Sequence, residues 1–182
     1  MTDTSLVRPV KPEDRDGLLD LLRMRHAEFG LGAWDRDRAG ATLQLAIDGT
    51  GTIFAGVVAG PAHPEATIGL ALARWWDEAD FHLEALWDYV HPDHRTTLQG
   101  ATEHTNRLHR FAMLCADRLG MPVYLGGPIR GDSQGKVKAY CRHFRPAGAF
   151  FTYGGEGWKR MSKSSRTAMA EGFIKAFEGS GP

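Results

Sequence analysis

The sequence is poor in cysteine, in long apolar runs and in net charge, and each lack excludes a class of protein. Its 182 residues include only two cysteines, Cys115 and Cys141, too few for the disulfide framework of a small secreted domain. No stretch reaches the roughly 18 apolar residues that a membrane-spanning helix needs. Lys+Arg and Asp+Glu both total 22, so the net charge gives no support to a nucleic-acid or anionic-membrane partner.

The N-terminus also lacks the charged and then apolar leader of an exported protein. Together with the scarcity of cysteine, this leads us to expect a cytoplasmic protein that binds neither membrane nor nucleic acid. Hydrophobic residues make up 42% and charged residues 24% of the chain, as in ordinary globular proteins. The length is most simply that of one domain with its own core.

Apolar periodicity and turn residues predict strands and helices in alternation. We expect strands over residues 5–10, 52–59, 66–74, 83–90, 123–126, 150–153 and 158–162, and helices over 12–29, 36–47, 97–119, 133–144 and from 164 onward. The strand at 123 follows a long helix and should lie parallel to the strand before it, whereas short loops give antiparallel pairs. The order predicts an α/β fold, with a mixed, mainly antiparallel sheet of about seven strands flanked by helices.

The segment 83–119 is the most informative part of the chain. An apolar strand runs into the turn 91–94, then into Arg95 and a long amphipathic helix. The first amides of that helix have no intrahelical partner, and the positive end of the helix dipole faces the turn, so the turn is suited to an anion. Arg95 is a charged contact for such an anion by residue type and position. Its alternative is a solvated arginine beside Asp93.

Three short motifs follow one another in the second half of the chain: VHPDHR at 90–95, LGMPV at 119–123 and KAYCRHF at 138–144. They resemble the motifs of the GNAT superfamily of acyl-CoA N-acyltransferases, in which V-x-P-x-x-R joins the fourth strand to the helix that binds coenzyme A. The order of elements also matches over about residues 5–162. The resemblance implies a GNAT-like domain over residues 1–163, followed by an extra C-terminal helix and tail over 164–182.

The resemblance implies acetyl-CoA as co-substrate, with its pyrophosphate on the turn after the strand 83–90. It assigns coenzyme A binding to Tyr89, Val90, Arg95, Thr96, Thr97, Leu98, Gly100 and Ala101. In the family, a G-x-G or G-x-A turn follows the arginine, and here Leu98 replaces its first glycine. Because glycine lets backbone approach a ligand closely, this pyrophosphate loop is degenerate relative to the family pattern.

The reaction that the resemblance implies is direct attack of an amine on a thioester, which needs a proton acceptor and a proton donor for the leaving thiolate. Tyr140 lies where the family often has its general acid, and a phenol is protonated at pH 7. Its alternative is a tyrosine that only packs its ring. Glu84 and Asp88 are the candidate bases, Glu84 being favoured, since alternation places both on one face of the strand. Either could instead border a solvated face.

The sequence therefore predicts an N-acyltransferase that moves an acetyl group from acetyl-CoA to a primary amine on a small molecule or a protein. The alternative is a catalytically inactive GNAT-like binding or assembly module, which Leu98 motivates. The extra C-terminal helix offers a surface for a partner or a second copy, so a homodimer stays open.

Four histidines lie in or near the same segment: His91, His94, His104 and His109. We expect no metal site from them. His104 and His109 are five residues apart on a helix and so face different ways, and we expect no cysteine or carboxylate to complete a set of three or four ligands.

Overall fold

The computed structural model of the chain describes residues 7–30, 32–75, 79–95 and 98–126. The chain divides into two compact units, residues 1–30 with 34–147 and residues 31–33 with 148–182. Every helix and strand described below belongs to the first unit. The predicted helices at 133–144 and from 164 onward, the predicted strands at 150–153 and 158–162, and the predicted boundary after residue 163 all lie outside the described residues.

Helices and strands follow one another in the predicted order. They are β1 (Arg8–Pro9), the short 3-10 helix η1 (Pro12–Asp14), α1 (Arg15–Phe29), α2 (Arg36–Ile47), β2 (Ile53–Ala59), β3 (Pro64–Ala73), β4 (His82–Val90), the 3-10 helix η2 (Pro92–His94), α3 (Leu98–Leu119) and β5 (Val123–Tyr124). The bounds of α2 match the prediction. Strands β1 and β5 each have two residues and are shorter than predicted. Within the described ranges, no helix has the length and apolarity that a membrane crossing needs.

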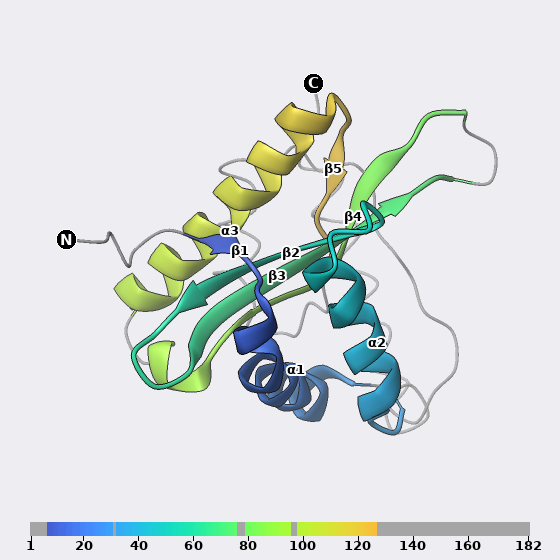
Figure 1. Cartoon of the computed structure of the whole chain (residues 1–182). Coiled ribbons are helices and arrows are strands. Elements are labelled where there is room, and N and C mark those ends of the chain that lie inside the picture. Colours follow the sequence, from blue (N-terminus) through green and yellow to red (C-terminus); the bar gives the residue numbers. More distant parts are fainter. Residues whose placement is uncertain (1–6, 31, 76–78, 96–97, 127–182) are drawn as a thin grey trace, which may run out of the picture. The chain divides into compact units, whose positions relative to one another are not determined.

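The strands form one sheet in the order β1-β2-β3-β4-β5 (Figure 1). The pairs up to β4 are antiparallel, and β4 with β5 is parallel, because α3 carries the chain back across the sheet between them. A mixed, mainly antiparallel sheet is therefore confirmed. Five of the seven predicted strands lie in the described part of the chain.

Helices cover both faces of this sheet and enclose two hydrophobic cores (Figure 1). In α1, four buried leucines recur at spacings of three and four, which places them on one side of the helix. Three of them, Leu18, Leu19 and Leu22, form the first core with α2 and with Val57 of β2. The next residue, Val58, belongs to the second core beneath α3. Neighbouring strand residues point to opposite faces, so the two cores lie on opposite sides of the sheet.

A bulge interrupts the alternation of β4. Gly69 pairs with Trp87, while the next residue of β3, Leu70, pairs with Ala85, so Leu86 is an extra residue in β4. Ala85 packs against the core beneath α3. In an uninterrupted strand Trp87 would share that face, but Trp87 belongs to the core of α1 and α2. Residues on either side of Leu86 therefore cannot be assigned to faces by simple alternation.

The indole of Trp87 lies directly over Gly69. A Cβ atom added to Gly69 would meet the indole carbons Cε2 and Cζ2 at 2.3 Å. The indole Nε1–H donates to the Thr67 hydroxyl at 3.3 Å, and this hydroxyl donates to the Gly56 carbonyl at 2.9 Å. The indole N–H of Trp87 and the hydroxyl of Thr67 are thus both paired. Trp87 is held in place both by packing and by a hydrogen bond.

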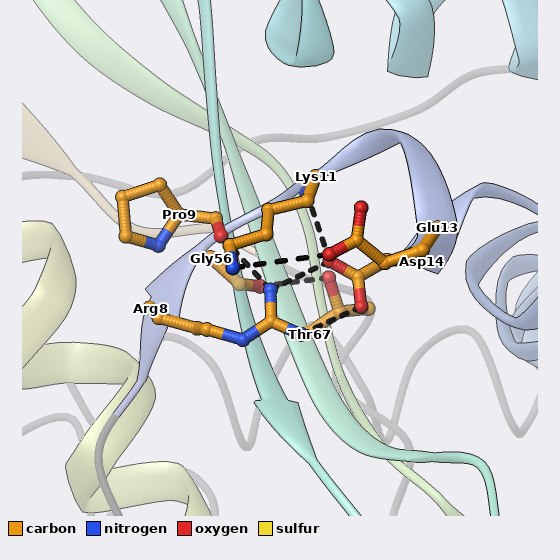
Figure 2. A network of polar contacts seen from close by, with 7 residues as sticks. All are labelled: Arg8, Pro9, Lys11, Glu13, Asp14, Gly56 and Thr67. Carbon is orange, nitrogen blue, oxygen red and sulfur yellow. Dashed lines mark hydrogen bonds and ion pairs between the residues drawn. The ribbon is translucent and has the colours of Figure 1, made fainter.

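Arg8 and Asp14 join β1 to η1 through a bidentate ion pair (Figure 2). The two guanidinium nitrogens donate to the two carboxylate oxygens at 2.6 and 2.7 Å, and the Lys11 amide donates to the same carboxylate at 2.8 Å. Burial alone would raise the pKa of Asp14, but the hydrogen bonds from Arg8 and Lys11 and their charges lower it overall.

The stabilisation by Asp14 should depend on pH. Its folded-state pKa is lowered, so its contribution is present above the unfolded-state pKa, about 4, and is lost as the pH falls through the folded-state pKa. Asp14→Asn should therefore lower the free energy of unfolding by about 1 kcal/mol near pH 7, because Arg8 is partly exposed, and by much less at pH 3. Urea unfolding at both pH values measures this. Asp16→Asn, at a mostly exposed carboxylate, is the control, and an equal loss at both pH values would contradict the prediction.

Candidate functional site

Strands β4 and β5 are paired only at one end. The pairs are Leu83 with Val123 and Glu84 with Tyr124, and the Leu83 amide donates to the Pro122 carbonyl at 2.9 Å. β4 continues to Val90, but in the described part of the chain no strand pairs with it on this side beyond Glu84. The last pair, at Glu84, lies two residues before Leu86, the extra residue of the bulge.

The last residue of β4 turns its backbone toward the unpaired side. The Val90 carbonyl accepts a hydrogen bond from Arg95 Nε at 2.6 Å, whereas the following amide, of His91, donates to the Glu65 carbonyl of β3 at 2.7 Å. The amide and carbonyl of one strand residue point the same way. The Val90 amide therefore points away from β3, to the side of β4 on which β5 pairs at Leu83 and Glu84.

The Arg95 side chain is held by Glu28, from the end of α1. Its Nη1 and Nη2 atoms donate to the two Glu28 oxygens at 2.9 and 3.0 Å, and its guanidinium lies 4.4 Å from the centre of the Tyr89 ring. The Tyr89 hydroxyl donates to the same Glu28 carboxylate at 2.5 Å. This cluster ties the end of β4 to the end of α1.

The protonation states in this cluster follow from its burial and charges. Burial, and then the hydrogen bond to Glu28, raises the pKa of Tyr89 to about 12, so the phenol keeps its proton at neutral pH. Burial alone would lower the pKa of Arg95, but the hydrogen bond to Glu28 and the nearby negative charge raise it overall. The cluster therefore holds one fixed positive and one fixed negative charge.

Arg95 was predicted to contact an anion, with solvation beside Asp93 as the alternative. The structure directs three of its five N–H donors to Glu28 and Val90. The contact with Glu28 spans 67 residues of sequence, and no local pattern signals it. A role of Arg95 in anion binding stays a prediction. An anion would bind to the other two N–H donors of the guanidinium.

Glu84 and Asp88 were predicted to share a face of β4, and this is wrong. Residues that pair across neighbouring strands lie on the same face of a sheet. Glu84 pairs with Ala71, and Ala71 pairs with Ile53, which packs against the core of α1 and α2. Asp88 pairs with Ile68, which belongs to the core beneath α3. The extra residue of the bulge lies between them and reverses the faces that counting by two predicts. The structure does not bring the two carboxylates together, and the role of either as a base stays a prediction.

The remaining predicted site residues are only partly described. Leu98, Gly100 and Ala101 lie in the first turn of α3, where the backbone amides have no intrahelical acceptor. Thr96, Thr97 and Tyr140 lie outside the described residues. The predicted anion position at the helix N-terminus thus follows the end of β4 at Val90, and the coenzyme A contacts stay predictions.

A cluster of histidines and carboxylates on the side of β3 was missed. Glu65, His94 and His104 each place one ligand atom within 4.8 Å of the others, and His63, His91 and Asp93 do the same. Burial is the main cause that lowers the pKa of both His91 and His104. The predicted absence of a carboxylate is wrong, because β3 brings Glu65 to 3.5 Å from His104. Only long-range strand pairing places it there.

No protein-family model matches the sequence, and no curated protein matches it significantly. Solved structures do match. A ribosomal-protein-alanine N-acetyltransferase from Brucella melitensis biovar Abortus 2308 is 17% identical, with a TM-score of 0.57 over 81% of this chain and 95% of that one. A GNAT family acetyltransferase from Staphylococcus aureus subsp. aureus USA300_TCH1516 is 14% identical, with a TM-score of 0.55 over 82% and 97%.

An aminoglycoside antibiotic 6′-N-acetyltransferase from Acinetobacter haemolyticus is 12% identical to this chain, with a TM-score of 0.58 over 82% of this chain and 97% of that one. Identities this low establish a shared fold and nothing finer. The parallel β4–β5 pair, the helix that follows β4 and these structural matches agree. The chain has the GNAT fold, that of the GNAT-family acetyltransferases.

Proposed function

We propose that this protein is an N-acyltransferase that moves an acetyl group from acetyl-CoA to a primary amine. The observation that carries the proposal is the edge of β4 from Ala85 to Val90, which has no strand partner on the β5 side in the described part of the chain and leads through η2 to the start of α3. An extended ligand adds hydrogen bonds along an unpaired strand edge, and a helix N-terminus favours phosphate. Coenzyme A combines an extended arm with a pyrophosphate, which suits this pair of features.

The proposed reaction is a direct transfer. The amine nitrogen attacks the thioester carbonyl carbon, the carbon–nitrogen bond forms, the carbon–sulfur bond breaks, and the amine gives up a proton while the thiolate gains one. The Val90 amide, which points away from β3, is our candidate donor to the carbonyl oxygen. Glu84 or Asp88 would accept the proton of the amine, but not both at one site, because they lie on opposite faces. Tyr140 remains the proposed acid.

The structural neighbours support an amine as the acceptor substrate and do not indicate which amine. Two of the structural neighbours are named for N-acetyl transfer, one to a ribosomal protein alanine and one to an aminoglycoside. These two acceptors differ in size and charge. The structural similarity therefore favours an amino group as the acceptor but does not favour a protein over a small molecule.

A second function has two observations in its favour. Arg95 is held by Glu28 and Val90, and Leu98 occupies the place of the first glycine of the family turn. Both features weaken a pyrophosphate site. They favour a GNAT-fold module that binds a partner without catalysing transfer, as the alternative to the acyltransferase.

Acetyl-CoA should bind the wild-type protein, and Leu98→Gly should bind it more tightly, by about three- to tenfold, because glycine permits closer approach of the backbone. The same change should lower the stability of the free protein by up to about 1 kcal/mol, since glycine disfavours helix. Calorimetric titration gives the affinity, and the ligand-dependent rise in melting temperature checks it. Release of free thiol in the presence of a panel of amines measures transfer.

Leu114→Gly is the matched control for this test, since Leu114 is an exposed leucine farther along the same helix. It should weaken the helix without changing the affinity for acetyl-CoA. If neither the wild type nor Leu98→Gly binds acetyl-CoA at millimolar concentration, the acyltransferase proposal is wrong and the binding module remains.

A further inference from the structure

Three segments that are distant in the sequence bring a carboxylate and two imidazoles together near the start of α3. Glu65 comes from β3, His94 from η2 and His104 from α3. One ligand atom of each lies within 4.8 Å of the other two. The side chain of His104 is 9% exposed and that of Glu65 20% exposed, so the cluster is largely below the surface.

These groups converge without satisfying one another. The Glu65 Oε2–His104 Nε2 distance is 3.5 Å, beyond the usual length of a hydrogen bond. The Nδ1 atom of His104 is buried and has no hydrogen-bond partner within the described part of the chain. A buried polar group left unpaired costs about 1–3 kcal/mol. Nε2 is the ring nitrogen near Glu65, so Nε2 would be the metal ligand and Nδ1 would take the outer hydrogen bond, such as one to water, that metal-bound histidines usually make.

We propose that Glu65, His94 and His104 bind one divalent transition-metal ion, and that Zn²⁺ fits this set best. Imidazole with a carboxylate suits zinc and the later first-row metals, whereas magnesium and calcium prefer oxygen alone. Ligand atoms around a tetrahedral zinc ion lie about 3.4 Å apart, given bonds of about 2.1 Å. From separations of at most 4.8 Å, side-chain shifts of less than about 1 Å close the site. Three protein ligands leave a fourth position for water.

The backbone around the three ligands is fixed. The His91 amide donates to the Glu65 carbonyl at 2.7 Å, and Ala66 pairs with Val90, so the segments that carry Glu65 and His94 are joined by strand hydrogen bonds. Gly60 leaves room for the carboxylate: a Cβ atom at Gly60 would lie 2.8 Å from Glu65 Oε1. These ligands therefore come from a preformed frame, which a metal site requires.

The neighbouring set His63, His91 and Asp93 is the weaker candidate. The His91 Nδ1 atom already accepts a hydrogen bond from the Asp93 amide, at 3.3 Å, and the Asp93 side chain is 76% exposed. His63 is exposed as well. The ring of His63 lies 6.0 Å from that of His94, so this set borders the proposed site without being needed for it.

The proposed ion would join β3, η2 and α3 and so fix the start of α3. It takes no part in acyl transfer, and it does not depend on the function proposed above. Its test uses the free protein without acetyl-CoA, so the two proposals can fail independently.

The experiment is a calorimetric titration of Zn²⁺ into the full-length, tag-free chain after treatment with a chelator. We expect one Zn²⁺ per chain and a rise in the melting temperature, with Mg²⁺ causing neither. Glu65→Gln and His94→Gln should each weaken Zn²⁺ binding at least tenfold. His26→Gln, on α1 and outside both clusters, should bind as the wild type does, and so should His63→Gln.

Two results would overturn the proposal. The first is a wild-type protein that binds no Zn²⁺ at micromolar concentration. The second is wild-type affinity in both Glu65→Gln and His94→Gln. Circular dichroism of the metal-free variants shows that they fold. The visible spectrum of bound Co²⁺ reports tetrahedral coordination in the wild type, which needs no variant.

Discussion

Gly69→Ala should lower the free energy of unfolding by about 2–3 kcal/mol, the upper part of the range of about 1–3 kcal/mol for overpacking of a well-filled core. The added methyl group would lie 2.3 Å from the Trp87 indole, far inside van der Waals contact. The indole cannot move aside, because it is buried in the core of α1 and α2 and its Nε1–H is bonded to Thr67. Alanine is otherwise favoured over glycine in a strand, by about 0.5–1 kcal/mol. Urea unfolding followed by circular dichroism measures the net loss.

A double-mutant cycle identifies the cause. Trp87→Phe should itself destabilise the protein, by about 1–2 kcal/mol, through the lost volume and hydrogen bond. With the smaller ring in place, Gly69→Ala should cost much less than it does beside Trp87, so the double variant should be more stable than the sum of the single changes predicts. Additive effects would show that the close approach of Gly69 and Trp87 is not the reason.

Glu28→Gln should lower the free energy of unfolding by about 1–2 kcal/mol, since it leaves the Arg95 charge without its partner. The value is below that for a fully buried pair because both side chains are one-third exposed. The pKa of Tyr89 should fall from about 12, while remaining above its ordinary value because burial is the larger cause. Urea unfolding and spectroscopic titration of tyrosine measure these changes.

The same variant tests the predicted role of Arg95. If Arg95 is an anion contact that Glu28 holds back, Glu28→Gln should bind acetyl-CoA more tightly although it is less stable. Glu13→Gln, which removes a mostly exposed carboxylate, is the control with the same change in net charge. Unchanged stability in Glu28→Gln would contradict the structural role of the Glu28–Arg95 pair.

Local patterns in the sequence predicted the order of the elements. The apolar spacing in α2 fixed its bounds, and the long helix before Val123 required β5 to be parallel to β4. The bulge has no such pattern, because HLEALWDYV contains neither glycine nor proline and reads as one regular strand. The assignment of Glu84 and Asp88 to one face failed for this reason.

The candidate site depends on contacts that local patterns do not carry. Glu28 reaches Arg95 from α1, and Glu65 reaches His104 from β3. In the sequence each carboxylate is one of many polar residues, and only the packing of α1 and β3 against the end of β4 selects it. The predictable part of the site is therefore its backbone, a strand leading into a helix, while the partners of its charged side chains follow from the tertiary fold.

The bulge has a consequence for how such a site is gained or lost in evolution. Removing Leu86 would leave every other residue of β4 opposite its present partner in β3, and would leave both cores their present side chains. It would also let β4 run straight past Glu84, where its pairing with β5 now ends. A single codon inserted or deleted in one strand can therefore change how much of its edge is free to pair while the fold around it is inherited unchanged.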